Sequence, residues 1–287
     1  MSHPVRRSVA FTAVATTLAL PLAAGFWWSR HGGPAWLGFV CTIAYMGTPI
    51  LTTVGFARRD GDTLRRRLAF RWTRRWAWLA AFWLPLAISL GAAALTLLLP
   101  GITYDPQMGG MLARLDEPTR LVAEAQIASL PPPQVLVPLI VLQALIAGGT
   151  VNAVAAYGEE AGWRGWMHVE LAPIGFWPRA VLTGLLWGLW HAPLILQGYN
   201  YPQHPVVGVA FMVAMCVGLS GPMAEVRDRT GSAVAAAIFH GVFNATAGLS
   251  VMYAVGGSDL LVGVTGAAGL GVLAVTNLGL VGWRRRS

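Results

Sequence analysis

The chain has 287 residues, of which 55% are hydrophobic and only 11% are charged. A typical soluble domain contains about 25% charged residues, and the mean hydropathy of this chain is positive. This composition excludes a soluble globular domain and predicts an integral membrane protein. The strand-like alternation of apolar and polar residues is missing from the sequence, which favours a helical bundle over a membrane β-barrel.

The formal net charge of +8 comes from arginine, because the sequence contains no lysine. The arginines lie between apolar segments, and this distribution fits membrane topology better than nucleic-acid binding. Cys41 and Cys216 both lie in apolar runs, which indicates neither a disulfide framework nor a cysteine metal pair. We therefore expect the lipid bilayer and membrane-associated molecules as partners, and no nucleic acid.

A helix needs about 20 apolar residues to cross the ~30 Å hydrocarbon core of a bilayer. The fold class that the sequence predicts is all-α, a polytopic membrane helical bundle with about eight transmembrane helices. The expected spans, in chain order, are 9–28, 35–56, 76–99, 135–157, 178–197, 205–225, 232–253 and 260–282. The start of the chain also resembles a signal peptide, but its apolar run continues to Trp28, which favours an uncleaved first span.

Arginine fixes the expected orientation of these spans. The densest cluster lies between the second and third spans and consists of Arg58, Arg59, Arg65, Arg66, Arg67, Arg71, Arg74 and Arg75. Of the 20 arginines, only Arg30, Arg114 and Arg120 fall on the opposite side. Positive residues collect in cytoplasmic loops, so both termini are expected to be cytoplasmic. The compact, all-arginine chain looks bacterial, and we expect a multi-pass protein of the bacterial inner (plasma) membrane.

Two features are expected at the membrane surfaces. The long loop 100–134 lies on the outer side and is expected to include a short helix around 109–129 on the membrane surface. Trp163 and Trp166 follow the fourth span, and we interpret them as anchors at the cytoplasmic interface.

Few ionisable side chains remain at membrane depth once the loops are set aside. They are Glu159, Glu160, Arg164, His191 and His240. Such residues are costly in hydrocarbon and usually face a cavity or a partner, so they mark function. Counted from the turns between neighbouring spans, the glutamates and both histidines lie about 18–26 Å deep, at ~1.5 Å per residue. The sequence therefore predicts one shared layer, accessible from the cytoplasmic side.

The spacing within this set indicates roles. Arg164 lies four residues after Glu160, the spacing of a helical ion pair. Glu159 points about 100° away from Glu160 on a helix and is free to face a different group. A lone carboxylate in a mostly apolar cavity can act as a general base. His240 and Asn244 are four residues apart and share one helix face.

The fifth expected span repeats this four-residue spacing. Trp187 lies four residues before His191, so its indole can form a wall of the site. Pro193 has no backbone N–H and weakens the helix just past His191. Gly184 and Gly188 would allow close helix packing, although glycine is simply common in membrane helices.

Three motifs in order resemble the CPBP family of membrane proteins, which includes the type II CAAX prenyl endopeptidases and bacteriocin-processing enzymes. They are EEAGWR at 159–164, WGLWH at 187–191 and HGVFN at 240–244. Trp187 stands where the family has phenylalanine. The resemblance covers residues 140–250. The expected organisation is a single integral membrane domain, 1–287, with a catalytic core at 135–253 and flanking membrane helices at 1–134 and 254–287.

The resemblance implies a cavity open to the cytoplasm and the bilayer, and endoproteolysis of a membrane-associated protein or peptide. The catalytic residues that it implies are Glu159, Glu160, His191, His240 and Asn244, supported by Arg164 and Trp187. The first glutamate would activate a water, and His191 would orient that water or bind metal. His240 and Asn244 would stabilise the oxyanion or complete a metal site.

Two alternatives stay open at this point. A Zn²⁺ ion could be held by Glu159, His191 and His240, or the same residues could form a general base and an oxyanion pocket. The sequence has no HExxH pair, and Asn244 is a better oxyanion donor than a zinc ligand, which favours the metal-free version. The second alternative is a non-catalytic membrane scaffold or bacteriocin self-immunity protein that uses the same cavity for binding.

Overall fold

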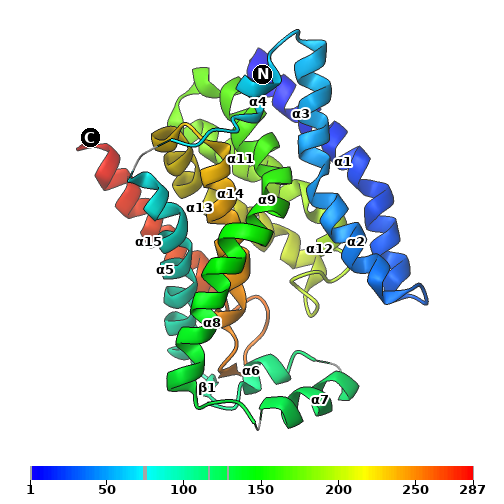
Figure 1. Cartoon of the computed structure of the whole chain (residues 1–287), viewed down its shortest axis with the longest axis vertical. Helices are drawn as coiled ribbons and strands as arrows, with labels where there is room; N and C mark the ends of the chain where they lie inside the picture. Colours follow the sequence, from blue (N-terminus) through cyan, green and yellow to red (C-terminus); the bar gives the residue numbers. More distant parts are fainter. Residues whose placement is uncertain (1, 74–75, 116, 128, 287) are drawn as a thin grey trace.

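The chain folds into a helical bundle, shown by a computed structural model that describes residues 2–286 except 74, 75, 116 and 128 (Figure 1). Arg74 and Arg75 of the predicted arginine cluster lie outside the described residues. Up to residue 147 the helices are α1 (His3–Arg30), α2 (Ala35–Met46), α3 (Thr48–Arg59), α4 (Leu64–Leu68), α5 (Ala77–Leu97), α6 (Gly109–Leu112), α7 (Glu117–Ile127) and α8 (Pro133–Ala147).

The rest of the chain builds the second half of the bundle. Its helices are η1 (Gly148–Asn152), α9 (Ala153–Glu160), η2 (Ala161–Met167), α10 (His168–Glu170), η3 (Ala172–Ile174), α11 (Phe176–Trp190), α12 (Ala192–Ile195), α13 (Pro205–Thr230), α14 (Ala233–Thr246), η4 (Ala247–Ser250) and α15 (Ala267–Arg284). Two short strands, β1 (Thr103–Tyr104) and β2 (Ala254–Val255), pair antiparallel.

Seven helical stretches in the described part of the chain are long and apolar enough to cross a membrane. They are α1, α2–α3, α5, α8–α10, α13, α14–η4 and α15. The remaining expected span, 178–197, is divided between α11 and α12, which are separated at His191. The predicted class, a polytopic membrane helical bundle, is therefore confirmed, and the chain is a multi-pass membrane protein.

Both termini lie at the same end of the bundle (Figure 1). Ion pairs join distant segments there: Arg7 and Arg67 both pair with Glu170, at 3.5 and 3.3 Å, and Arg284 pairs with Glu225. We call this end, which also carries α4, the arginine-rich end. Its composition agrees with the arginine distribution expected from the sequence.

Long loops occupy the opposite, arginine-poor end. The strands β1 and β2 join two of these loops, and α6 and α7 lie there, where the sequence predicted a surface helix. The hydroxyl of Tyr201 donates to the carbonyl of Thr265 at 2.8 Å, which connects loop 196–204 to loop 251–266. Arg30, at the end of α1, donates to the backbone of loop 196–204 at 2.7 Å. These contacts fix the loops relative to the bundle.

Gly184 and Gly188 bring α11 close to α13. A Cβ added at Gly184 would lie 2.5 Å from the Cα of Val217, and one at Gly188 would lie 2.5 Å from the Cα of Val213. Side chains larger than hydrogen would force the two helices apart. Of the two readings that the sequence left open, the structure therefore favours close helix packing, which places α11 beside α13 directly before His191.

Candidate active site

The glutamate pair lies in one long helical stretch that runs from Pro133 at the arginine-poor end to Glu170 at the arginine-rich end. Two π-helical segments interrupt its α-helical hydrogen bonding, and the second, η2, starts directly after Glu160. Single π segments are rare and often occur at functional sites. Every residue of η2 is buried, and Glu159 and Glu160 are only 2% and 0% exposed. Both carboxylates therefore face protein and not lipid.

Glu160 is the centre of a buried charge cluster. Both of its carboxylate oxygens accept from Nη1 of Arg164 at 3.1 Å, so the predicted helical ion pair is confirmed. The Nη2 of Arg164 donates to the hydroxyl of Ser220 at 2.9 Å, and Nδ1 of His240 lies 3.0 Å from Oε1 of Glu160. Burial of a carboxylate is tolerated when it is paired and hydrogen-bonded, and this cluster meets both conditions.

Glu159 faces a different group, as its position on the helix requires. The indole N–H of Trp187 donates to Oε2 of Glu159 at 2.7 Å. The same ring lies under the Arg164 guanidinium, whose central carbon is 4.5 Å from the ring centroid. Among the described residues, no hydrogen bond reaches Oε1 of Glu159. The indole thus fixes one carboxylate oxygen and leaves the other for the cavity.

His191 lies where α11 ends. Its backbone N–H bonds to the carbonyl of Gly188 at 3.2 Å, and its ring Nδ1 bonds to the carbonyl of Trp187 at 2.9 Å. Pro193 cannot donate to the preceding turn, which is consistent with the break between α11 and α12. Because a carbonyl can only accept, Nδ1 carries the proton, and Nε2 of the neutral ring keeps a lone pair.

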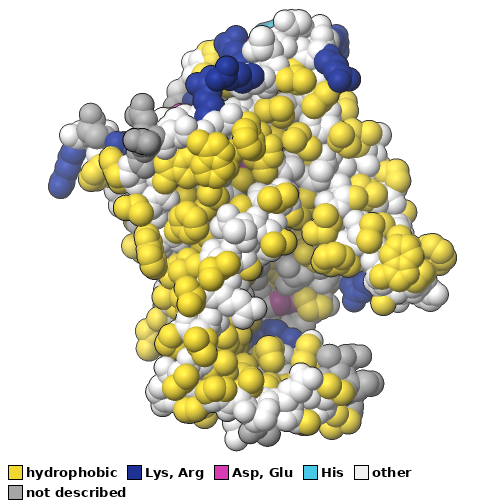
Figure 2. Space-filling view, viewed as in Figure 1, with side chains coloured by type: hydrophobic (Ala, Val, Ile, Leu, Met, Phe, Trp, Pro, Cys, Tyr) yellow, Lys and Arg dark blue, Asp and Glu magenta, His cyan; other side chains and the backbone are white. Residues whose placement is uncertain are grey.

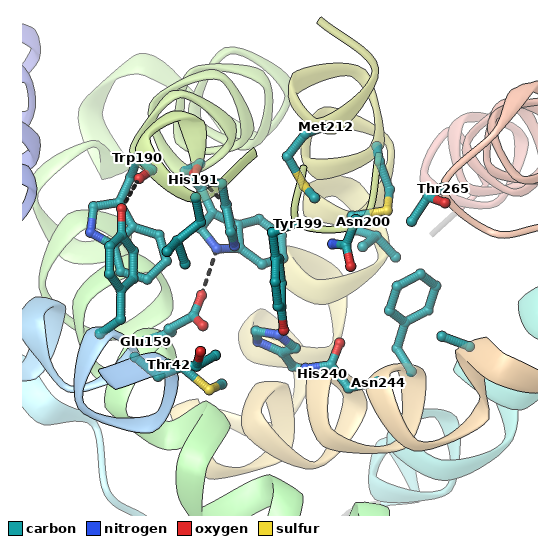
Figure 3. A pocket seen from close by; sticks show the side chains of 18 of the residues that line it. Thr42, Glu159, Trp190, His191, Tyr199, Asn200, Met212, His240, Asn244 and Thr265 are labelled. Carbon is teal, nitrogen blue, oxygen red and sulfur yellow. Dashed lines mark hydrogen bonds between the residues drawn. The ribbon is translucent and has the colours of Figure 1, made fainter. Parts of the chain in front are cut away.

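A cavity of about 250 Å³ lies beside these groups. Glu159, His191, His240 and Asn244 all line it, and their side chains point toward a common space (Figure 3). Asn244 makes no hydrogen bond within the described residues and is exposed. The structure therefore brings four of the five catalytic candidates to one cavity, and the fifth, Glu160, lies behind it, bonded to His240.

The cavity opens toward the arginine-poor end, which corrects one expectation. Tyr199, Asn200 and Thr265, from loops of that end, line it. The surface is hollowed between α8 and α2, above α6 and α7 (Figure 2). The expected access from the side of the termini is wrong, because residues 161–168, which follow Glu160 toward that side, are all buried.

Several residues at the site carried no signal in the sequence. Ser220 looks like an ordinary serine in an apolar helix, yet it bonds Arg164. Tyr45 lines the cavity, and its hydroxyl donates to the carbonyl of Trp190 at 2.6 Å. Tyr199 lies in a loop without a motif. Only the tertiary structure brings these side chains to the site.

Gly241 allows α14 to approach the helix that carries the glutamates. A Cβ at this position would lie 2.3 Å from the carbonyl oxygen of Gly148 and 2.6 Å from the backbone nitrogen of Ala153. Gly241→Ala is therefore expected to displace His240 and to destabilise the fold by about 1–3 kcal/mol, measured as a lower melting temperature in detergent.

The matched control for this prediction is Gly279→Ala in α15. No described atom lies within 4 Å of a Cβ built at Gly279, so this variant is expected to melt no lower than the wild type. Equal melting temperatures for both variants would contradict the close contact at Gly241.

The alternative zinc ligands Glu159, His191 and His240 are not grouped around a common point in this structure. Within the described ranges, no group of three His, Cys, Asp or Glu side chains could hold a metal ion. In each candidate one polar atom is bonded to a neighbour and the other is left free by the described residues: Glu159 accepts from Trp187 through Oε2, and the histidines bond a carbonyl (His191) or Glu160 (His240) through Nδ1. The arrangement suits a general base beside hydrogen-bonding groups.

The helical membrane bundle places the three motifs, which resemble those of the CPBP family, around one cavity. Residues 135–246 match the family model described as Type II CAAX prenyl endopeptidase Rce1-like. This match confirms the family resemblance that the motifs predicted, and it supports CAAX-type intramembrane protease activity in general. A comparison with curated proteins finds no match.

Proposed function

We propose that this protein is an intramembrane endopeptidase that hydrolyses a peptide bond of a membrane-associated protein or peptide, in a bacterial cell membrane. The observation that carries the proposal is the carboxylate of Glu159 at the wall of the cavity. One of its oxygens is held by Trp187, and His191, His240 and Asn244 line the same space. A cavity that only bound a partner would not require a base, two imidazoles and an amide together.

Glu159 is the general base of the proposed reaction. It removes a proton from a water molecule while the water oxygen attacks the carbonyl carbon of the scissile bond. The lone pair on Nε2 of His191 accepts a hydrogen bond from the same water and orients it. Glu159 then gives the proton to the amide nitrogen as the C–N bond breaks. The products are a new carboxyl end and a new amino end.

His240 and Asn244 are the proposed donors to the oxyanion. Glu160 bonds Nδ1 of His240, which orients the ring and leaves Nε2, when it is protonated, to donate into the cavity. The Asn244 side-chain amide is the second donor. Donors that are fixed before the reaction stabilise the charge that develops on the carbonyl oxygen, and each is worth about 10²–10³ in rate.

The experiment that tests the proposal compares new protein N-termini in membranes of cells that make wild type or Glu159→Gln. Glutamine keeps the shape of the side chain and removes the base. When both proteins are expressed and folded equally, we expect some N-termini to appear only with wild type. These N-termini identify the substrate. Identical sets would instead favour a non-catalytic scaffold or immunity protein.

Trp187 is the proposed positioning residue for the base. Trp187→Phe introduces the phenylalanine that the CPBP family has at this position. It keeps an aromatic ring beside Arg164 but removes the indole N–H that donates to Glu159. A hydrogen bond to a charged group contributes about 1.5–3 kcal/mol, so kcat is expected to fall about 10-fold or more with KM little changed.

Trp163→Phe is the matched control for that variant. Trp163 is also fully buried, but its indole nitrogen has no hydrogen-bond partner among the described residues. Its substitution tests the loss of a buried indole without loss of a hydrogen bond. If both variants lose kcat equally, Trp187 acts through packing and not through Glu159.

A metal-free mechanism predicts the response to chelators. Purified protein that has been treated with 1,10-phenanthroline and then dialysed is expected to keep its full hydrolytic rate, because none of the proposed proton transfers needs a metal ion. Loss of activity that is restored by added Zn²⁺ would contradict this mechanism and favour rearrangement of Glu159, His191 and His240 around a metal.

A further inference from the structure

The cavity is closed toward the arginine-rich end. Along the helix, the distance from Glu159 to Glu170 at that end is about 17 Å, at 1.5 Å per residue. This length is filled by protein: Trp163 and Trp166 are fully buried, and the ring of Phe11 stacks on Trp166 with 4.6 Å between centroids. A polypeptide therefore has no route to Glu159 from the side of the termini.

The cavity is open toward the arginine-poor end. Its lining continues from Glu159 past Asn244 to Asn200 and Thr265, which belong to the loops of that end. Asn244 and Asn200 are exposed, whereas Glu159 at the inner end is buried. Exposure thus increases from the base toward the loops, as expected for a cavity with its mouth at the arginine-poor end.

The mouth also borders the region that faces lipid. Thr42, Met46 and Tyr199 line both the cavity and a neighbouring groove. The groove continues over α1 and α2, where its wall includes Phe26 and Phe39, and Phe39 is 72% exposed. An apolar segment that lies in the bilayer can contact this groove while the adjoining peptide bond reaches the polar cavity.

The arginine distribution relates this geometry to the two sides of the membrane. Apart from Arg30, Arg114 and Arg120, the arginines among the described residues lie at the closed end or in the segments leading to it, and positively charged loops stay in the cytoplasm. We infer that the cavity opens to the extracytoplasmic side, and that the substrate is a membrane-anchored polypeptide whose scissile bond lies in the outer half of the bilayer or just beyond it. This substrate class rests on the proposed protease function, whereas the direction of the opening does not.

Thiol labelling in native membranes tests the opening without any need for activity. Asn244→Cys and Ala247→Cys place a thiol on the cavity wall, and Arg65→Cys places one at the arginine-rich end. The probe is a membrane-impermeant maleimide, applied to spheroplasts and to inverted membrane vesicles. Wild type, whose Cys41 and Cys216 are buried, is the unlabelled control.

The expected result is labelling of both cavity thiols in spheroplasts only, and of Arg65→Cys in inverted vesicles only. Cavity thiols that react from the vesicle side, from both sides or from neither side would overturn the inference. Reaction of Arg65→Cys in spheroplasts would overturn the assigned orientation.

The positions of the cleavage products test the substrate class. N-termini that depend on Glu159 are expected in the outer half of membrane segments or in the adjoining extracytoplasmic residues. N-termini on the cytoplasmic side would overturn this inference and leave the protease function intact. If no N-terminus depends on Glu159, the protease function and the substrate class both fail, and the labelling result still decides the direction of the opening.

Discussion

Glu159→Gln is expected to lower kcat of the purified protein by about 10²–10⁴-fold, the contribution of a well-placed general base. The amide has nearly the shape of the carboxylate and its oxygen can still accept the Trp187 N–H, so the cavity should keep its form. It cannot take a proton from water. Substrate binding, and with it KM, is therefore expected to change little, and the loss should appear in turnover.

The control for this variant is the same substitution at an exposed carboxylate that does not line the cavity. Glu124 lies on α7 with its side chain 46% exposed, so Glu124→Gln is expected to hydrolyse the substrate at the wild-type rate. The substrate is the one identified by its Glu159-dependent N-terminus. A folded Glu159→Gln protein with wild-type kcat would show that Glu159 is not the base.

Local spacing in the sequence predicts local contacts well at this site. Glu160 and Arg164 lie one helical turn apart, and the turn itself brings their charges together whatever the rest of the chain does. The two glycines of α11 likewise predict a close helix contact, because the absence of side chains at this spacing leaves a groove on one helix face. Such predictions need only the helix period.

Contacts between distant segments could not be predicted in this way. The mouth of the cavity is formed by Tyr199 and Thr265, which come from loops far apart in the sequence. The spacing of residues within one helix therefore cannot predict the direction in which the cavity opens. The sequence predicts that Trp163 and Trp166 are interfacial anchors, but both are fully buried, because α1 and α3 cover the segment that carries them. A tryptophan near the end of an apolar run is equally compatible with the membrane interface and with the buried core.

The role of Trp187 shows the same limit at the level of one atom. The sequence identified its ring as a wall, since it lies one turn before His191. That its indole N–H reaches Glu159 depends on the distance between α9 and α11, which the packing of both helices against the bundle determines. A phenylalanine at this position would form the same wall without the hydrogen bond.

Arg164→Met is expected to be the most destabilising of the substitutions considered for this protein. Methionine fills much of the space of the arginine side chain but leaves the Glu160 carboxylate buried without its cation. Breaking a buried ion pair by removal of one partner costs about 3–5 kcal/mol. For a protein of this size that corresponds to a melting temperature lower by roughly 10 °C, measured in detergent by intrinsic fluorescence.

Two comparisons separate the buried charge from simple loss of an arginine. Arg66 pairs with Asp62 at 3.7 Å, but its side chain is 63% exposed, and surface pairs contribute about 0–1 kcal/mol, so Arg66→Met is expected to melt near the wild type. In the double variant Glu160→Gln with Arg164→Met the uncompensated charge is gone, so much of the lost stability should return. Activity should not return, because His240 has lost the carboxylate that orients its ring. If Arg164→Met melts like Arg66→Met, or if the double variant melts no higher than Arg164→Met alone, the buried charge at Glu160 is not what Arg164 stabilises.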